Sequence, residues 1–180
     1  MLLWGVADIR DRDQWLHTFN TNIHPYFFMA KYALPHMKRG GTIINNASIN
    51  AYIGRPDLLD YTSTKGAIVS FTRGLSNQQV GKGIRVNAIA PGPVWTPLIP
   101  STMPDKAQKQ FTAPIGRPCR MSPFPTHSLL SKPTNRSSCA DTRRVEPSEI
   151  ATCVVFLASP DSSSISGQTI HCNGGSVVSG

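Results

Sequence analysis

The chain has 180 residues, of which 39% are hydrophobic and 16% are charged, and it carries a formal net charge of +8. The length fits a single domain, and the composition is that of an ordinary globular protein. The charge does not indicate a nucleic-acid partner, because the basic residues are not interleaved with aromatic ones and half of the net charge lies in residues 119–145. The apolar run at the start is too short for a signal peptide or a membrane span, so no membrane partner is expected.

A long helix is predicted over about residues 11–38. Apolar side chains recur there close to the helical repeat: Trp15, Phe19, Ile23, Phe27 and Leu34. Two prolines interrupt the pattern, and we expect Pro25 to kink the helix and Pro35 to lie near its end. Asn22 lies within this helix, and two consecutive glycines then terminate it.

The next elements carry the residues that indicate chemistry. A strand is predicted at 42–47, directly before Ser48, and a helix at 61–79 begins with Tyr61 and Lys65. Residues at i and i+4 share a helical face, so the ammonium can lie beside the phenol and lower its pKa from about 10, which makes the tyrosine a usable proton donor or acceptor. With Ser48 holding a substrate oxygen, the three predict interconversion of a carbonyl and an alcohol. The tyrosine–lysine pair alone fits a packed tyrosine beside a solvated lysine equally well.

The remaining elements alternate between strand and helix. A strand apolar on both faces is predicted at 84–90 and leads into a Pro-Gly loop at 91–96. A short helix is expected at 101–111, a longer one at 147–158, and a last strand at 168–172. This alternation predicts an α/β fold with a parallel sheet.

Residues 119–145 depart from this pattern. The segment has three prolines, five serines and no apolar periodicity, which predicts a disordered insertion. A retained intron or an error in the gene model would explain it, and a lineage-specific loop is the alternative.

The cysteines indicate neither a metal site nor a disulfide framework. No Cys-x-x-Cys pair occurs among the four of them, which are Cys119, Cys139, Cys153 and Cys172. Cys153 falls on an apolar helix face and is expected in the core. Without a signal sequence, we expect reduced thiols and a cytoplasmic location.

Several of these runs resemble the classical short-chain dehydrogenase/reductase family when taken together. They are Asn22, the spacing of Ser48, Tyr61 and Lys65, the loop at 91–96, and the run from 165 to the Asn-Gly-Gly at 173–175. The resemblance covers about residues 8–118 and 146–175 and points to the branch similar to glucose/ribitol dehydrogenases. It implies a Rossmann-type, doubly wound parallel sheet.

The resemblance also implies roles for single residues. Tyr61 would be the proton donor or acceptor, Lys65 would lower its pKa and bind the nicotinamide ribose, and Ser48 would position the substrate oxygen. Asn22 would hold a water that relays protons to solvent. The implied catalytic residues are Asn22, Ser48, Tyr61 and Lys65. The implied cofactor-binding residues are Asn22, Tyr61, Lys65, Val94 and Thr96.

The family further implies a nicotinamide cofactor, with NADP favoured over NAD. The substrate would be a small-molecule carbonyl or alcohol, and the complete enzyme would be a homo-oligomer. These expectations rest on the resemblance and not on composition or spacing.

The sequence departs from the family at its start. The glycine-rich turn that takes the cofactor pyrophosphate does not occur in it. We therefore expect residues 1–180 to form one partial NAD(P)-binding domain with strands five to seven and an open sheet edge. The family also implies that the helices on either side of the Ser48 strand form a dimer interface. The alternative is a non-catalytic fragment that is inert or docks on a full-length paralogue through these dimer helices. A hydrolase with Ser48 as nucleophile is excluded, because no Gly-x-Ser-x-Gly elbow occurs and no histidine is placed to activate the serine.

Overall fold

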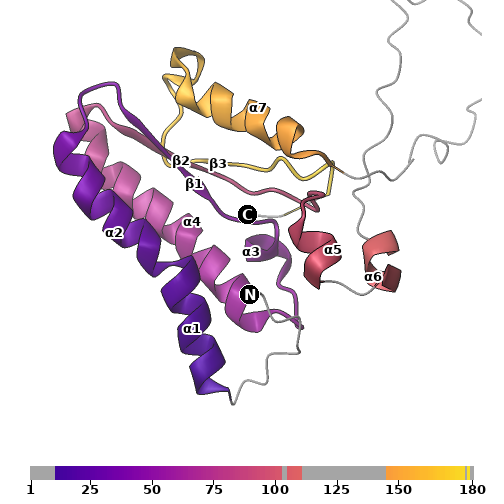
Figure 1. The fold of residues 1–180 in the computed structure, drawn as a ribbon. Coiled ribbons are helices and arrows are strands. Elements are labelled where there is room, and N and C mark those ends of the chain that lie inside the picture. The colour runs from indigo at the N-terminus through magenta and orange to yellow at the C-terminus, as the bar shows by residue number, and fades with distance from the viewer. Residues whose placement is uncertain (1–10, 103–104, 111–144, 177, 179–180) are drawn as a thin grey trace, which may run out of the picture.

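The computed structural model describes residues 11–102, 105–110, 145–176 and 178. Within them, three parallel strands form one sheet in the order β1-β2-β3 (Figure 1). The strands are β1 (Thr42–Asn46), β2 (Arg85–Ile89) and β3 (Thr169–Ile170). β1 pairs with β2 from Thr42 opposite Arg85, and β2 pairs with β3 from Ala88 opposite Thr169. The predicted α/β class and parallel sheet are confirmed.

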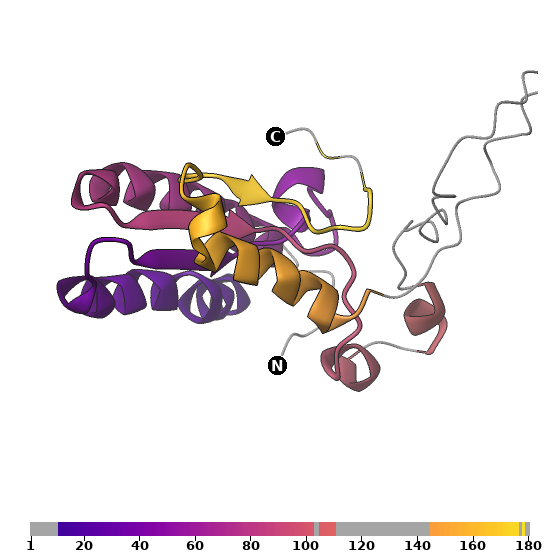
Figure 2. The same ribbon diagram turned by 90° about the horizontal axis from the view of Figure 1, so that it is seen from above.

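Helices cover both faces of this sheet, so the described chain has three layers (Figure 1). Seen from above, the helix of residues 147–158 crosses in front of the strands (Figure 2). One face carries α1 (Arg12–Asn22), α2 (His24–Ala33) and α4 (Leu59–Gln79), and the other carries α7 (Pro147–Ala158). Near the carboxyl ends of the strands lie α3 (Asn50–Ile53), α5 (Leu98–Thr102) and α6 (Asp105–Gln110). Short 3-10 turns are η1 (Leu34–His36), η2 (Val80–Lys82) and η4 (Pro160–Ser162).

The prediction of one helix over residues 11–38 is wrong, because the segment forms two helices. The chain breaks at Ile23, whose φ of −118° lies outside helical values, and a second helix starts at His24 with Pro25 in its first turn. Proline is tolerated there because its missing N–H would have no partner in the helix. Trp15 and Phe27 of the predicted apolar stripe are 38% and 54% exposed, so the stripe does not form one buried face.

The core lies between the sheet and α4. One buried cluster joins Ala30, Leu75 and Val86, and another joins Ala47, Ile68 and Val69. The second cluster lies directly under the carboxyl end of β1, so its packing fixes the strand end from which Ser48 follows.

On the other face, α7 has the bounds that the sequence predicts. A capping box explains this, because the Glu146 and Glu149 side chains each bind a backbone N–H at the helix start. Leu157 is fully buried against the sheet. Arg85 holds the helix end, since its guanidinium donates to the carbonyl oxygens of Leu157 and Ser159 at 3.1 Å.

Cys153 on α7 is half-buried, not fully in the core as expected. Both Cys153 and Cys172 are free thiols, and burial raises the pKa of Cys172 to about 11. A thiol with so high a pKa stays protonated at neutral pH, which fits a packing role.

The predicted insertion at 119–145 falls outside the described residues except for its last residue. Val145 is buried, forms a parallel bridge with Val94, and accepts a hydrogen bond from the Trp95 amide at 2.8 Å. Val145, which the sequence assigns to the insertion, is therefore part of the packed fold.

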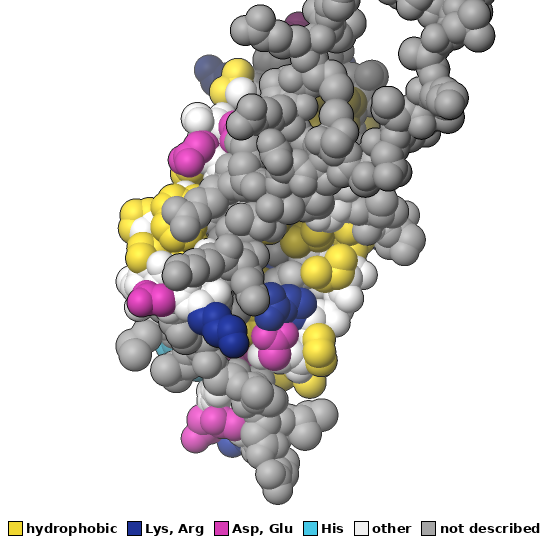
Figure 3. Space-filling model, turned by 90° about the vertical axis from the view of Figure 1, so that its right-hand side faces the viewer, with side chains coloured by type: hydrophobic (Ala, Val, Ile, Leu, Met, Phe, Trp, Pro, Cys, Tyr) yellow, Lys and Arg dark blue, Asp and Glu magenta, His cyan; other side chains and the backbone are white. Residues whose placement is uncertain are grey.

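Among the described strands, β1 and β3 each pair with β2 alone, so both lie at an edge of the sheet, and β1 is the edge strand that precedes Ser48. None of the helices in the described ranges combines the length and apolar character needed to cross a membrane. On the coloured part of the face where the strands end, basic and acidic side chains lie beside each other and beside hydrophobic ones (Figure 3).

Candidate active site

Ser48 lies at the carboxyl end of the sheet, two residues after β1. Its backbone is fixed by the neighbouring strand, because the amides of Ala47 and Ile49 donate to the carbonyl oxygens of Ile89 and Pro91. The Ser48 side chain is 8% exposed, and its Oγ accepts the Asn50 amide at 3.2 Å. A serine held this firmly presents its hydroxyl in one place.

Tyr61 lies in the first turn of α4 and directs its phenol to this serine. Burial raises the pKa of Tyr61 from its ordinary value, and a hydrogen bond with Ser48 partly offsets that rise. Two residues thirteen positions apart in sequence are thus joined through their hydroxyl groups. A substrate oxygen placed between them would meet both.

Lys65 lies one helical turn after Tyr61. Its Nζ donates to the Asn46 carbonyl oxygen at 2.9 Å and lies 5.5 Å from the centroid of the Tyr61 ring. Burial lowers the pKa of Lys65 to about 8. The amine is still mostly protonated at pH 7, so a positive charge stands beside the phenol.

The expected lowering of the Tyr61 pKa by Lys65 is not found. The pKa of Tyr61 is raised, with burial as the main cause and Ser48 as the group that opposes it. The physical reason is that Lys65 directs its ammonium to a backbone carbonyl and is itself poorly solvated. Lys65 lies beside the Tyr61 ring as the sequence predicts, but burial of the phenol sets the direction of the Tyr61 pKa shift.

Asn22 reaches the same helix from the end of α1. Its Nδ2 donates to Thr64 Oγ1 at 3.3 Å, and the fully buried Thr64 hydroxyl donates to the Tyr61 carbonyl oxygen at 2.7 Å. Asn22 therefore contacts the first turn of α4 through Thr64. Its predicted role of holding a water stays a prediction.

Val94 and Thr96 lie in the loop that follows β2. Val94 is anchored by its bridge with Val145, and the Thr96 carbonyl accepts the Ile99 amide at 3.0 Å at the start of α5. Both therefore lie at the carboxyl edge of the sheet, as Ser48 does. Their predicted contacts with a cofactor stay predictions.

Two further residues belong to this cluster and were missed by the sequence reasoning. The Tyr26 hydroxyl donates at 3.0 Å to the Asn46 carbonyl that Lys65 also binds. Asp60 is 6% exposed and accepts the Tyr61 amide at 2.7 Å. A signal existed for both, because Tyr26 follows Asn22 by one turn and Asp60 directly precedes Tyr61.

Among these groups, the Lys65 ammonium is the one that could hold hydroxyl oxygens of a cofactor. A buried ammonium with a lowered pKa gains from a ligand rich in hydroxyl acceptors. Beside it, a Cβ at Gly92 would lie 2.7 Å from the Asn173 carbonyl oxygen, so only glycine lets the two loops meet at the strand ends. No group of three or more His, Cys, Asp or Glu in the described part of the chain is placed to hold a metal ion.

Comparison with known proteins identifies the family. A family model described as enoyl-(acyl carrier protein) reductase matches residues 5–123 and 120–177. The chain is 52% identical over 175 residues to glucose and ribitol dehydrogenase of Daucus carota. This alignment covers 97% of the chain and 52% of that protein. The chain thus spans about half the length of the curated relatives it matches.

Two solved structures from Brucella melitensis share the fold. A short-chain dehydrogenase/reductase described as glucose/ribitol dehydrogenase is 32% identical with a TM-score of 0.69, over 93% of this chain and 58% of that one. A 3-ketoacyl-(acyl-carrier-protein) reductase complexed with NADH is 26% identical with a TM-score of 0.72, over 96% and 62%. The chain belongs to the short-chain dehydrogenase/reductase family, in the branch similar to glucose and ribitol dehydrogenases.

Proposed function

We propose that the chain takes part in an NAD(P)-dependent oxidation and reduction that interconverts a carbonyl and a secondary alcohol. The observation that carries the proposal is the junction of Ser48, Tyr61 and Lys65 at the carboxyl end of β1. A phenol, a hydroxyl and an ammonium meet there in a largely buried place. A positioned phenol with a neighbouring hydroxyl and ammonium can do acid/base work on a substrate oxygen atom.

In the direction of reduction, the nicotinamide cofactor would supply the hydride to the carbonyl carbon. Tyr61 gives its phenolic proton to the oxygen that becomes the alcohol, and Ser48 holds that oxygen by a hydrogen bond. Lys65 stabilises the phenolate that remains, and protonation from solvent restores the phenol. In the direction of oxidation the same proton returns to Tyr61.

The raised pKa of Tyr61 does not oppose this assignment. A buried phenol that stays protonated is a competent acid, and its conjugate base forms beside an ammonium that is still charged at pH 7. Asn22 is proposed to complete the path to solvent through a water. Val94 and Thr96 are proposed to contact the nicotinamide end of the cofactor.

The substrate class we propose is an aldose, ketose or polyol. The support is the 52% identity to a protein named glucose and ribitol dehydrogenase. The preference for NADP over NAD, the homo-oligomer and the cytoplasmic location stay predictions from the sequence.

The experiment that tests this is a turnover assay with NADPH and NADH against a panel of sugars, polyols and simple aldehydes. We expect turnover by the wild type and its loss in Tyr61→Phe, which removes only the phenolic oxygen. Tyr32→Phe is the matched control, because Tyr32 is 66% exposed on α2 and should be without effect. Full turnover in folded Tyr61→Phe would contradict the assignment.

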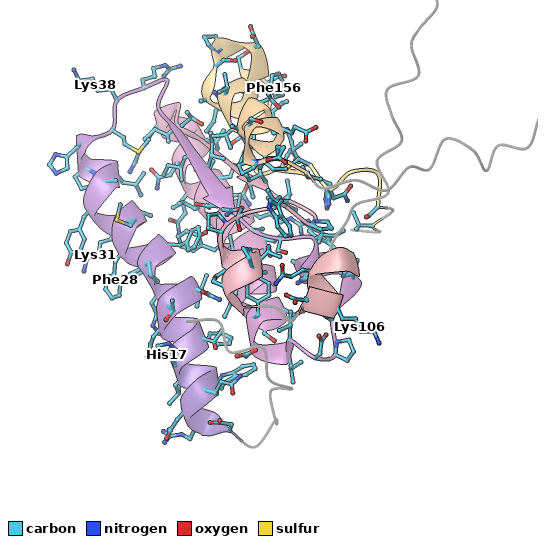
Figure 4. The ribbon with its side chains drawn as sticks, turned by 45° about the vertical axis from the view of Figure 1, so that its right-hand side comes forward. His17, Phe28, Lys31, Lys38, Lys106 and Phe156 are labelled. Carbon is cyan, nitrogen blue, oxygen red and sulfur yellow. The ribbon has the colours of Figure 1, made fainter. Side chains whose placement is uncertain are left out.

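The second candidate is a non-catalytic partner that docks through the helices of the α1–α2 layer. It is favoured by exposed apolar side chains there, which are Leu16, Phe27, Phe28, Met29 and Tyr32. Phe28 and Lys31 point outward from α2, away from the sheet (Figure 4). A folded chain that binds neither nucleotide but co-elutes with a full-length paralogue, and loses this with Phe28→Ser, would favour docking.

A further inference from the structure

The buried carboxylate of Asp60 is a feature that the proposed reaction does not yet use. It lies at the second residue of α4, directly before Tyr61, and is 6% exposed. Removing a carboxylate from water costs free energy unless hydrogen bonds replace the lost hydration. A buried carboxylate therefore needs hydrogen-bond donors, and the donors around Asp60 indicate its role.

Three donors surround Asp60. Its Oδ1 accepts the backbone amide of Tyr61 at 2.7 Å, and its Oδ2 accepts the Thr18 hydroxyl at 2.6 Å. The Gln14 side-chain amide reaches the same Oδ2 at 3.4 Å, a weaker contact. Thr18 and Gln14 both come from α1, so the carboxylate joins the start of α4 to another helix.

The charge of Asp60 is held by these donors and by its place in the helix. Within the ranges that the structure describes, no lysine or arginine forms an ion pair with Asp60; Arg55 pairs with Asp57 instead. A carboxylate in the first turn is favoured by the free N–H groups of the helix start. Leu58, the N-cap residue, has an apolar side chain and gives no side-chain hydrogen bond. Asp60 thus supplies the hydrogen bond that the cap residue lacks.

We propose that the Thr18–Asp60 hydrogen bond positions Tyr61 for proton transfer, an inference that rests on the proposed function. The first turn of a helix frays unless its N–H groups are bound. Asp60 binds the Tyr61 amide and is itself held by Thr18, so it anchors the backbone from which the phenol reaches Ser48. Asp60 and Thr18 act through Tyr61 and do not touch the reacting atoms.

The effect on chemistry follows from distance. A proton moves between heavy atoms about 2.6–3.2 Å apart, and a displacement of about 1 Å lowers a rate by up to about a hundredfold. Asn22 holds the same turn from a second point through Thr64. Loss of Thr18 should therefore loosen the turn without unfolding α4.

The test compares Thr18→Val with Thr18→Ser, which lose and keep the hydroxyl. The readout is the pKa of Tyr61 from the pH titration of its ring carbon by NMR in protein labelled at tyrosine, with Tyr61→Phe assigning the signal. In the wild type this pKa lies above the ordinary value because the phenol is buried. We expect Thr18→Val to shift it down toward the ordinary value and Thr18→Ser to leave it unchanged.

Thr72→Val is the matched control on the same helix. It removes the fully buried hydroxyl that accepts the Asn45 amide at 2.8 Å, far along α4 from Tyr61. Thr72→Val should lower the midpoint of unfolding but leave the pKa of Tyr61 unchanged. If Thr18→Val fails to fold, Asp60→Asn tests the same link, because it weakens the acceptor of both the Thr18 hydroxyl and the Tyr61 amide.

The outcomes separate this inference from the proposed function. An unchanged Tyr61 pKa in folded Thr18→Val and folded Asp60→Asn would overturn the positioning role, whatever the turnover. With turnover established, we expect kcat in Thr18→Val to fall at least tenfold, while KM changes less than twofold and Thr18→Ser restores the rate. Turnover that survives in Tyr61→Phe would instead remove the proposed function while the titration result stands.

Discussion

Replacing Lys65 with methionine should stabilise the protein at neutral pH. Methionine has similar length and no charge, so the buried site no longer holds an ammonium. The Asn46 carbonyl keeps a donor, since the Tyr26 hydroxyl also binds it at 3.0 Å. A gain in stability on removal of the ammonium beside the Tyr61 phenol would mean that the fold tolerates an unfavourable buried charge at the candidate site.

The magnitude follows from the pKa of Lys65, which falls from 10.5 to about 8 on burial. Each pKa unit corresponds to about 1.4 kcal/mol, so the buried charge costs about 3 kcal/mol at pH 7. Loss of the hydrogen bond to Asn46 takes back about 1 kcal/mol. We expect Lys65→Met to raise the free energy of unfolding by about 2 kcal/mol.

The pH dependence has a definite sign. Between pH about 8 and about 10.4 the unfolded chain binds more protons at this residue than the folded chain does, so wild-type stability rises with pH there. The penalty is complete below pH about 8 and is relieved as the pH rises. The advantage of Lys65→Met should therefore shrink to about zero near pH 9.5.

The assay is urea unfolding at several pH values from 7 to 9.5, followed by circular dichroism. Lys82→Met is the matched control, because Lys82 is exposed and should change the free energy of unfolding by less than about 0.5 kcal/mol. A Lys65→Met protein that is less stable than the wild type at pH 7 would refute the reasoning. So would a difference that does not vary with pH.

Two other substitutions test the packing of α7 on the sheet and the candidate site. Arg85→Met should lower the free energy of unfolding by about 2–4 kcal/mol in the same urea assay, because the carbonyl oxygens of Leu157 and Ser159 lose a charged donor at the end of α7. A change below about 0.5 kcal/mol would contradict this. Ser48→Ala should raise the pKa of Tyr61 further, because the hydrogen bond that lowers it is lost; an unchanged NMR titration would show that the two side chains do not interact.

The sequence predicts the regular elements well where local signals agree. The capping residues Glu146 and Glu149 set the start of α7 at the predicted residue. The strand before Ser48 and the helix of Tyr61 were likewise found, because apolar runs and glycines mark their limits. The spacing of Ser48, Tyr61 and Lys65 predicts a cluster, and the structure brings the three together.

What the sequence does not predict depends on contacts between distant segments. The sign of the Tyr61 pKa shift follows from burial, which no local spacing shows. The bond between Thr18 and Asp60 joins residues 42 positions apart. The break at Ile23 also exceeds the expected kink, because a new helix begins at His24 with Pro25 in its first turn.

The central claim is that hydride moves to a substrate carbon while Tyr61 moves the proton. The most direct measurement uses NADPH carrying deuterium at the transferable position of the nicotinamide, with a carbonyl substrate accepted in the turnover assay. We predict a product alcohol that carries deuterium on its carbinol carbon with wild-type protein, and no formation of this labelled product with folded Tyr61→Phe. An alcohol without deuterium, or equal transfer by Tyr61→Phe, would contradict the account.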